Sequence, residues 1–398
     1  RRRQRGSLSR ERGEGKQEEP WMRHRPRGDP RWALAAFLTL AALAAGLSPP
    51  TAEPPARRGR WGGSGGAPGP GMDPARLRDA LVASAEEAQE FIGTACPRVQ
   101  TPSALEFLRD YVAPNRPCVI TGAISHWPAM HKWQGEGGDA YLSEKFGQRK
   151  VKVNATPDGR GDAVLDGKYF VLPEERDMTF REFLAGMRAG PDVLYLSHQN
   201  DNLRDQLGGL LLGDVDASLP FADQALGVQP DAVNLWVGPA AAVTTLHKDH
   251  YENLYAVVRG RKLFTLYPPT SLPLLYPARY TPRQYRKAEG GGWDLVAPCG
   301  CNEGAFGGEA GGGGSHEWIG ADPQNPDLGA HPLFGRARAV EVAVSPGEVL
   351  YLPAMWYHQV RQDDDTFAVN YWYDMSYDSR YVHNRLIADL MGLAAAGR

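Results

Sequence analysis

The chain has 398 residues, of which 23% are charged and 42% hydrophobic, as is usual for a globular protein with a buried core. Its 44 Lys and Arg residues nearly balance 47 Asp and Glu residues, so the net charge is −3. This balance excludes the overall basic excess that is typical of nucleic-acid-binding proteins, and we expect no nucleic-acid partner. Four cysteines exclude a disulfide scaffold and favour a reducing compartment.

The first segment, residues 1–71, is rich in Arg, Gly, Pro and Ala and has almost no helical or alternating apolar pattern. Such a segment cannot bury enough apolar surface to offset the entropy that it loses on ordering. The first residue is Arg, and the next plausible translation starts are Met22 and Met72. We therefore expect residues 1–71 to be a disordered leader or an artefact of upstream translation.

Residues 32–47 form one apolar run inside this leader, with sixteen uncharged residues. A basic segment precedes the run and small residues follow it, which is the layout of a secretory signal. The run is short for a membrane span, which needs about 20 apolar residues. Because the cysteine content does not suggest secretion, we expect the signal to be unused or artefactual. We predict no membrane association and a location in the cytoplasm and nucleus.

The next region, residues 72–192, has both helix and strand patterns. Leu77, Leu81 and Ala85 are spaced by four and predict an amphipathic helix after Met72. Further helices are expected at 103–113 and at 179–190, the second ending at Gly190. Strands are expected at 117–124 and 150–159, so we predict a mixed α/β region.

Residues 193–390 consist mainly of short strands. A strand is expected at 193–199, and from Asp231 onward apolar and polar residues alternate in run after run, separated by Gly or Pro. The runs are 231–238, 242–249, 253–260, 261–269, 339–346, 348–360 and 366–375. Many short strands in succession predict a jelly roll, that is, a double-stranded β-helix. The fold class is therefore mainly β, α+β overall, with a helix at the C-terminal end.

A glycine-rich patch at 290–315 interrupts these strands and is predicted to be a flexible loop. It contains Cys299 and Cys301 in a Cys-Gly-Cys motif. Two thiols without nearby His residues do not make a persuasive metal site, and their role stays open.

The most informative motif is LHKDHYENLY, in which His247 and Asp249 are two residues apart. Residues i and i+2 of a strand point to the same face, so the imidazole and the carboxylate are expected side by side. His358, on a later strand, can supply a third ligand. Two His and one carboxylate form the facial triad of non-haem Fe(II) oxygenases, which leaves positions open for a co-substrate and O2. The pair alone is weak evidence, because a strand histidine is more often a packed core residue.

Lys262 strengthens this interpretation, because it stands among Leu263, Phe264 and Leu266 at the start of a strand. A lysine buried there without a partner would be costly, unless it binds the far carboxylate of a 2-oxoacid. Hydroxyl groups of Thr244 and Tyr195 could share that carboxylate. The alternative is an exposed lysine that guards an edge strand, and the residues alone do not decide between the two.

The remaining histidines lack a matching partner in the sequence. His250 neighbours Asp249, so on a strand it points away from both expected ligands. We expect it to lie behind the ligands or on the surface. Four further histidines without a matching partner are also left unassigned: His198, His316, His331 and His383.

Five segments together resemble the JmjC-domain 2-oxoglutarate oxygenases, specifically the small hydroxylase branch. They read CVITGAISHWPAM, NATPDGRGDAV, DAVNLWVGPAAAVTTLHKDHYENLYAVVRGRK, PGEVLYLPAMWYHQV and AVNYWYDM. The resemblance runs from Met72 to about Leu390 and departs at the leader and the glycine-rich patch. It implies Fe(II) on His247, Asp249 and His358. It also implies 2-oxoglutarate on Tyr195, Thr244, Asn253, Lys262 and Asn370, with Lys262 as the salt-bridge partner.

The resemblance also implies the reaction, which is (3S)-hydroxylation of a lysyl residue in a protein, with 2-oxoglutarate and O2 as co-substrates. The implied substrates are GTPases related to translation factors. Related hydroxylases are often dimers, so we also consider a homodimer whose contact involves Cys96 and the N-terminal helices.

Three alternative functions stay open at this point. An N-methyl-lysine demethylase would use the same chemistry and release formaldehyde. An endopeptidase acting on histone tails would use the metal to activate water, although neither a separate nucleophile nor an HExxH motif is present. A cupin-like binding protein without catalysis would not depend on Fe(II).

Overall fold

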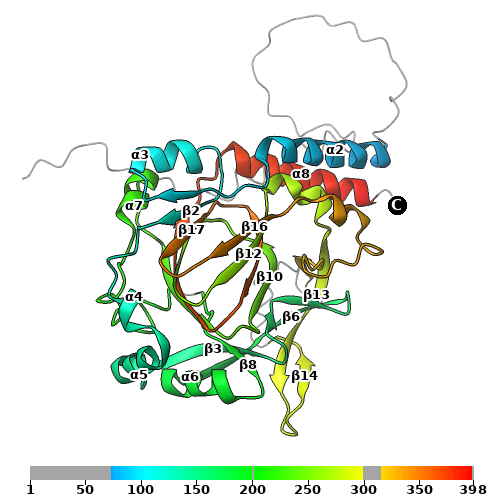
Figure 1. Ribbon diagram of the computed structural model, residues 1–398. Helices are drawn as coiled ribbons and strands as arrows, with labels where there is room; N and C mark the ends of the chain where they lie inside the picture. The colour runs from blue at the N-terminus through cyan, green and yellow to red at the C-terminus, as the bar shows by residue number, and fades with distance from the viewer. Residues whose placement is uncertain (1–72, 200, 299–314, 397–398) are drawn as a thin grey trace, which may run out of the picture. The chain divides into compact units, whose positions relative to one another are not determined.

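Two facing β-sheets form the centre of the structure, a computed structural model that describes residues 73–199, 201–298 and 315–396 (Figure 1). The leader 1–71, with its run 32–47, and the pair Cys299 and Cys301 lie outside the described residues. The larger sheet has the order β1 (Arg98–Gln100), β2 (Cys118–Thr121), β17 (Glu348–Leu352), β11 (Tyr251–Arg259), β19 (Thr366–Asp374), β9 (Ala232–Gly238). The smaller one has the order β16 (Val340–Val344), β12 (Lys262–Tyr267), β18 (Tyr357–Gln362), β10 (Val243–Lys248), β4 (Arg160–Gly161).

Strands β9 to β12 and β16 to β19 alternate between these two sheets, which confirms the predicted jelly roll. Alternation along each strand sends one set of side chains between the sheets. Buried residues from both sheets meet there: Trp236, Tyr255, Phe264, Val342, Leu350, Val360 and Ala368. Burying each large apolar side chain contributes roughly 1.5–3 kcal/mol, so this interior holds the two sheets together.

The outer face of the larger sheet is also buried, beneath the N-terminal region. On β11, Tyr255 faces the space between the sheets, whereas Leu254 and Ala256 belong to a second core. Phe107, Trp127, Trp133 and Leu203 from the segments around the sheet complete this second core. Because β11 is covered on both faces, its segment from Leu254 to Val258 is an unbroken apolar run.

Two smaller sheets border the jelly roll. One has the order β14 (Trp293–Val296), β13 (Pro277–Lys287), β6 (Tyr169–Leu172), β5 (Ala163–Leu165), with β15 (His316–Ile319) also paired to β13. The other has the order β7 (Glu174–Thr179), β3 (Lys150–Thr156), β8 (Val193–Tyr195). Strand β14 lies inside the range 290–315 that was predicted to be loop, because it pairs with β13 over Gln284–Lys287. The strand predicted at 193–199 ends at Tyr195.

The helices of the N-terminal region are α2 (Pro74–Ile92), α3 (Ala104–Phe107) continued by a π-helix η1 (Leu108–Val112), α4 (Ala129–Lys132), α5 (Gly135–Phe146) and α6 (Phe180–Ala189). Later in the chain follow α7 (Pro220–Leu226), the 3-10 helices η2 (Pro269–Leu274) and η3 (Pro332–Arg336), and α8 (Ser379–Ala396). Thr179 and Glu182 form a capping box at the start of α6, and Gly190 follows its end as predicted.

Helices α2 and α8, from the two ends of the described chain, lie side by side (Figure 1). Helix α2 confirms the helix that the sequence predicts after Met72, but its buried side chains are Val82, Ala85 and Gln89, whereas Leu77 and Leu81 of the predicted stripe are half-buried. Within the described ranges, no helix combines the length and the apolar character that crossing a membrane requires.

Candidate functional site

His247, Asp249 and His358 converge at one point inside the jelly roll, at the end where β10 turns into β11. His247 and His358 are direct partners in the antiparallel register of β10 and β18. The Oδ2 atom of Asp249 lies 3.7 Å from Nε2 of His247 and 3.6 Å from Nε2 of His358. One ligand atom from each residue lies within 4.8 Å of the others. Asp249 lies one residue beyond the end of β10. The connection between β10 and β11, and not the strand alternation expected from the sequence, therefore orients its carboxylate.

Backbone carbonyls fix the orientation of both imidazoles. Nδ1 of His247 lies 2.8 Å from the carbonyl oxygen of Thr245, and Nδ1 of His358 lies 3.1 Å from that of Trp356. A carbonyl accepts but cannot donate, so each Nδ1 carries the proton. In its neutral form each imidazole thus keeps an Nε2 lone pair on the side of Asp249, which is the tautomer that metal ligation needs.

The electrostatics of the three groups match this arrangement. Burial opposes the charge on Asp249, but the imidazoles of His247 and His358 outweigh it and lower the pKa of its carboxyl to about 2. Burial and the neighbouring His247 lower the pKa of His358 to about 4. An ionised carboxylate beside two imidazoles of which at least one is neutral is a donor set that fits a divalent cation.

Lys262 is buried between the sheets, with 1% of its surface exposed. Its Nζ donates to the hydroxyl of Tyr195 at 3.0 Å and to the side-chain oxygen of Gln362. Among the described residues it forms no ion pair, and burial lowers the pKa of its amine to about 7. The interpretation of Lys262 as an exposed edge lysine is therefore wrong. A buried amine without a carboxylate is prepared to accept an anion.

A chain of buried amides leads from the larger sheet toward the triad. Nδ2 of Asn370 donates to Oδ1 of Asn253 at 3.2 Å. The Oδ1 atom of Asn370 accepts from Nδ2 of Asn234 at 3.2 Å and from Nε1 of Trp236 at 2.9 Å. These bonds hold Asn253 and Asn370 in defined orientations in the interior.

All the predicted site residues except Lys262 line one small cavity. Its lining comprises Tyr195, Thr244, His247, Asp249, Asn253, His358 and Asn370, together with Gln199, Trp236, Tyr255, Phe264, Val360 and Trp372. Lys262 reaches this group through its hydrogen bond to Tyr195. Residues from distant parts of the sequence thus share one small space.

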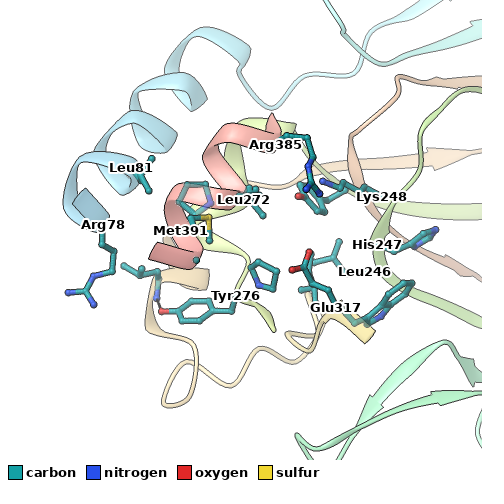
Figure 2. A pocket seen from close by; sticks show the side chains of 18 of the residues that line it. Arg78, Leu81, Leu246, His247, Lys248, Leu272, Tyr276, Glu317, Arg385 and Met391 are labelled. Atoms are coloured by element: carbon teal, nitrogen blue, oxygen red, sulfur yellow. Dashed lines mark hydrogen bonds between the residues drawn. The ribbon is translucent and has the colours of Figure 1, made fainter. Parts of the chain in front are cut away.

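A larger cavity lies on the outer side of β10, among α2, η2, β15 and α8 (Figure 2). Figure 2 shows Leu81, Leu272 and Met391 around it, with His247 at its border and directed away from the two helices. Because it contains neither Asp249 nor His358, we place the chemistry in the smaller cavity despite the difference in size.

Two residues that support the site did not emerge from the sequence. Gln362 faces Lys262 in the register of β12 and β18 and bonds to its amine. It is four residues after His358 on the same strand, so strand alternation could have revealed it. Trp318 on β15 stacks on the ring of His247 with centroids 5.7 Å apart and planes 7° apart. No local pattern marks Trp318, because β15 lies directly after the glycine-rich patch.

The histidines without an assignment stay apart from the triad. His250 is exposed beside the turn and its ring contacts Tyr381, as expected for a residue outside the ligand set. His198 lies 3.7 Å from Glu175, and His316 stacks on Phe170. Neither belongs to a cluster of metal-ligating groups in the described part of the chain.

Comparisons with known proteins agree with this geometry. Residues 103–379 match the model of the Cupin-like domain family. The human bifunctional peptidase and (3S)-lysyl hydroxylase JMJD7 is 43% identical over 73% of this chain and 87% of its own length. Lysine-specific demethylase JMJ32 of Arabidopsis thaliana is 37% identical over 75% of this chain and 88% of its own. The JmjC domain-containing protein E of Dictyostelium discoideum is 33% identical over 76% of this chain and 91% of its own.

Proposed function

Since this chain belongs to the cupin-like JmjC-domain family, we propose that it is an Fe(II)- and 2-oxoglutarate-dependent oxygenase that hydroxylates C3 of a lysyl residue in a protein. The observation that carries the proposal is the meeting of two imidazoles and one carboxylate in the same cavity whose wall contains Tyr195, the partner of the buried Lys262. The triad suits a divalent metal ion, and the buried amine beside it suits a carboxylate. A ligand that coordinates the metal and also carries a second carboxylate would use both features.

In this proposal, Nε2 of His247, Nε2 of His358 and the Asp249 carboxylate hold Fe(II). The carbonyls of Thr245 and Trp356 keep both imidazoles in the required tautomer. When bound, Fe(II) supplies, with 2-oxoglutarate and O2, the oxidising power for C–H hydroxylation, with succinate and CO2 as co-products. No side chain needs to act as a general acid or base. The protein binds the metal ion and the substrates, orients them, and excludes water.

The 2-oxoglutarate tail is assigned to the amine of Lys262. Tyr195 and Thr244 offer hydroxyl groups beside it, and Asn253 and Asn370 offer amides on the opposite wall. A charged hydrogen bond in a dry interior is stronger than one in water, so Lys262 selects a co-substrate with a second carboxylate.

The choice of lysine as the target residue is supported by the name of the human relative, a (3S)-lysyl hydroxylase. GTPases related to translation factors, as substrates, and a homodimer are further parts of the proposal that rest on the sequence resemblance. The relatives named as demethylases and as a peptidase define the competing outcomes of the test.

The test incubates the purified full chain with Fe(II), 2-oxoglutarate, O2 and a panel of lysine peptides from translation-factor-related GTPases. Mass spectrometry is expected to find one added oxygen on a lysine. Loss of a methyl group with formaldehyde release would instead identify a demethylase. Peptide cleavage that persists without 2-oxoglutarate would identify a peptidase.

Removal of one proposed iron ligand gives the first specific prediction. His247→Ala or Asp249→Ala is expected to reduce succinate formation by more than about 100-fold, because ligand loss weakens metal binding more than outer contacts do. His383→Ala, an exposed histidine on α8, is the control and is expected to retain activity. Turnover that survives in both ligand variants would rule out the assignment.

A further inference from the structure

Residues 157–162 form a short loop whose backbone is hydrogen-bonded to β10, the strand of His247. Strand β4 pairs in parallel with β10, so Gly161 is the register partner of Thr244. The amide of Gly159 donates to the hydroxyl of Thr156 at 2.9 Å, and the carbonyl of Gly159 accepts from the amide of Val243 at 2.9 Å. These bonds fasten the loop against the strand that carries His247.

Asp162, which directly follows Gly161 of β4, has a left-handed backbone conformation. Its φ of 51° lies in the left-handed region, which L-residues other than Asn and Asp rarely adopt. Its carbonyl oxygen accepts a hydrogen bond from the hydroxyl of Thr245, two residues before His247. The hydrogen bond to Thr245 and the pairing of β4 with β10 thus hold Asp162 in one place beside the strand of His247.

The side chain of Asp162 has no hydrogen-bond or ion-pair partner among the described residues. Burial raises the pKa of its carboxyl to about 6, and the nearby His247 opposes this rise. Asp162 is half-buried, and among the described residues its carboxylate forms no ion pair, so a cationic ligand can bind it without displacing another cation.

Asp162 lines a small cavity that adjoins the one with the triad. The two cavities share four lining residues: Tyr195, Gln199, Trp236 and Thr244. Among the described residues that line this second cavity, none is Lys, Arg or His. Asn154, Thr156 and Ser197 add neutral oxygen atoms to the Asp162 carboxylate. One carboxylate among neutral polar side chains, in a lining without a cationic residue, suits a primary ammonium group.

We propose that Asp162 binds the ammonium group of the substrate lysine and thereby selects lysine for oxidation. This inference rests on the proposed oxygenase function and adds to it a residue that determines specificity. In an extended lysine side chain, four single bonds separate C3 from the ammonium nitrogen, a span of about 5 Å. If C3 of the substrate lysine lies in the cavity of the triad, its ammonium group would therefore reach the adjoining cavity that Asp162 lines.

The test compares Asp162→Asn with a matched control, Asp166→Asn. Asp166 also has a positive φ, 55°, but it is exposed, and Asn tolerates this backbone conformation. The probes are the best lysine peptide of the panel and the same peptide with norleucine, which keeps the methylene chain and lacks the amine. Succinate formation without any peptide reports the condition of the iron site.

Asp162→Asn is expected to lower kcat/KM for the lysine peptide by about 10- to 100-fold, mainly through KM. The norleucine peptide and the peptide-free reaction are expected to change by less than about twofold. The control variant should behave as the unmodified protein with both peptides. An equal loss with both peptides, or an unchanged preference for lysine in Asp162→Asn, would overturn the proposal.

A second measurement separates this inference from the proposed function. Saturation-transfer NMR follows binding of Nα-acetyl-lysine methylamide and of its norleucine counterpart to the full chain without metal. Lysine-selective binding that Asp162→Asn abolishes supports the ammonium site even if no peptide is oxidised. Binding that is equal for both compounds, or that survives in the variant, contradicts it. Absence of succinate in the unmodified protein would count against the oxygenase alone.

Discussion

The buried amine of Lys262 determines which charge a ligand of this cavity must carry. Its neighbours, Tyr195 and Gln362, are neutral, so the protein leaves its charge without a counter-ion. Burial lowers the pKa of this amine to about 7, far below the value of an exposed lysine. A bound dicarboxylate would supply the missing charge and raise the pKa again.

This coupling predicts that 2-oxoglutarate binding takes up a proton. The pKa of the free site is about 7 and rises on binding, so the ligand is bound best at low pH and loses affinity as the pH increases above 7. Calorimetry of the Mn(II)-loaded protein at pH 8, in buffers with different ionisation enthalpies, measures the uptake.

The control variant for this prediction is Lys262→Arg. Arginine stays charged at every accessible pH, so proton uptake should disappear even if binding is weaker. Uptake of the same size in Lys262→Arg would show that another group is responsible.

At the scale of elements, the site depends on how closely β4 approaches β10. Gly159 has φ +89°, and a Cβ atom placed there would overlap the carbonyl oxygen of Ala241. Only glycine fits this contact, which places Gly161 and Asp162 beside the strand of His247.

Gly159→Ala is therefore expected to reduce the free energy of unfolding by about 1–3 kcal/mol and to impair peptide oxidation, because the loop must move away from β10. Gly137→Ala is the matched control. Gly137 is exposed in α5, and no atom lies within 4 Å of the position that an added Cβ would take, so this change should stabilise the protein by about 0.5–1 kcal/mol. Urea unfolding of both variants measures the difference, and equal effects would refute the argument.

At the scale of the whole molecule, Asp214 joins the N-terminal helices to the segment that precedes α7. Its carboxylate is completely buried and accepts from Lys132 at 2.9 Å, Lys145 at 3.1 Å and Trp133 at 3.2 Å. Tyr141 also donates to it, at 2.8 Å. Burial opposes the charge, but these donors outweigh it and lower the pKa of Asp214.

Asp214→Asn is expected to lower the free energy of unfolding at pH 7 by roughly 3 kcal/mol, because two lysines lose the carboxylate. A carboxyl with a lowered pKa stabilises the fold above the pKa of the unfolded chain and loses this effect as the pH falls through the folded pKa. The difference between the variant and the unmodified protein should therefore shrink below about pH 4. A difference that is constant from pH 7 to pH 3 would disprove this account.

The strands of the jelly roll could be predicted from local patterns because each has a side facing the interior and a regular alternation. The pattern is weakest in the segment between β12 and β16. There, β13 pairs with β6, and β14 and β15 pair in turn with β13. Their residues are mostly exposed or half-buried, so they lack the regular apolar alternation that marks the strands of the jelly roll.

The sequence by itself determined the fold class and the family, and it indicated the three metal-binding candidates, because residue types and their spacing are local properties. Only the tertiary structure decided that Lys262 is buried without a counter-ion, that Gln362 bonds to it, and that the Asp162 carboxylate is left without a partner beside His247. The physical reason is that burial and charge compensation depend on which distant strands meet, and that is a property of the folded chain alone.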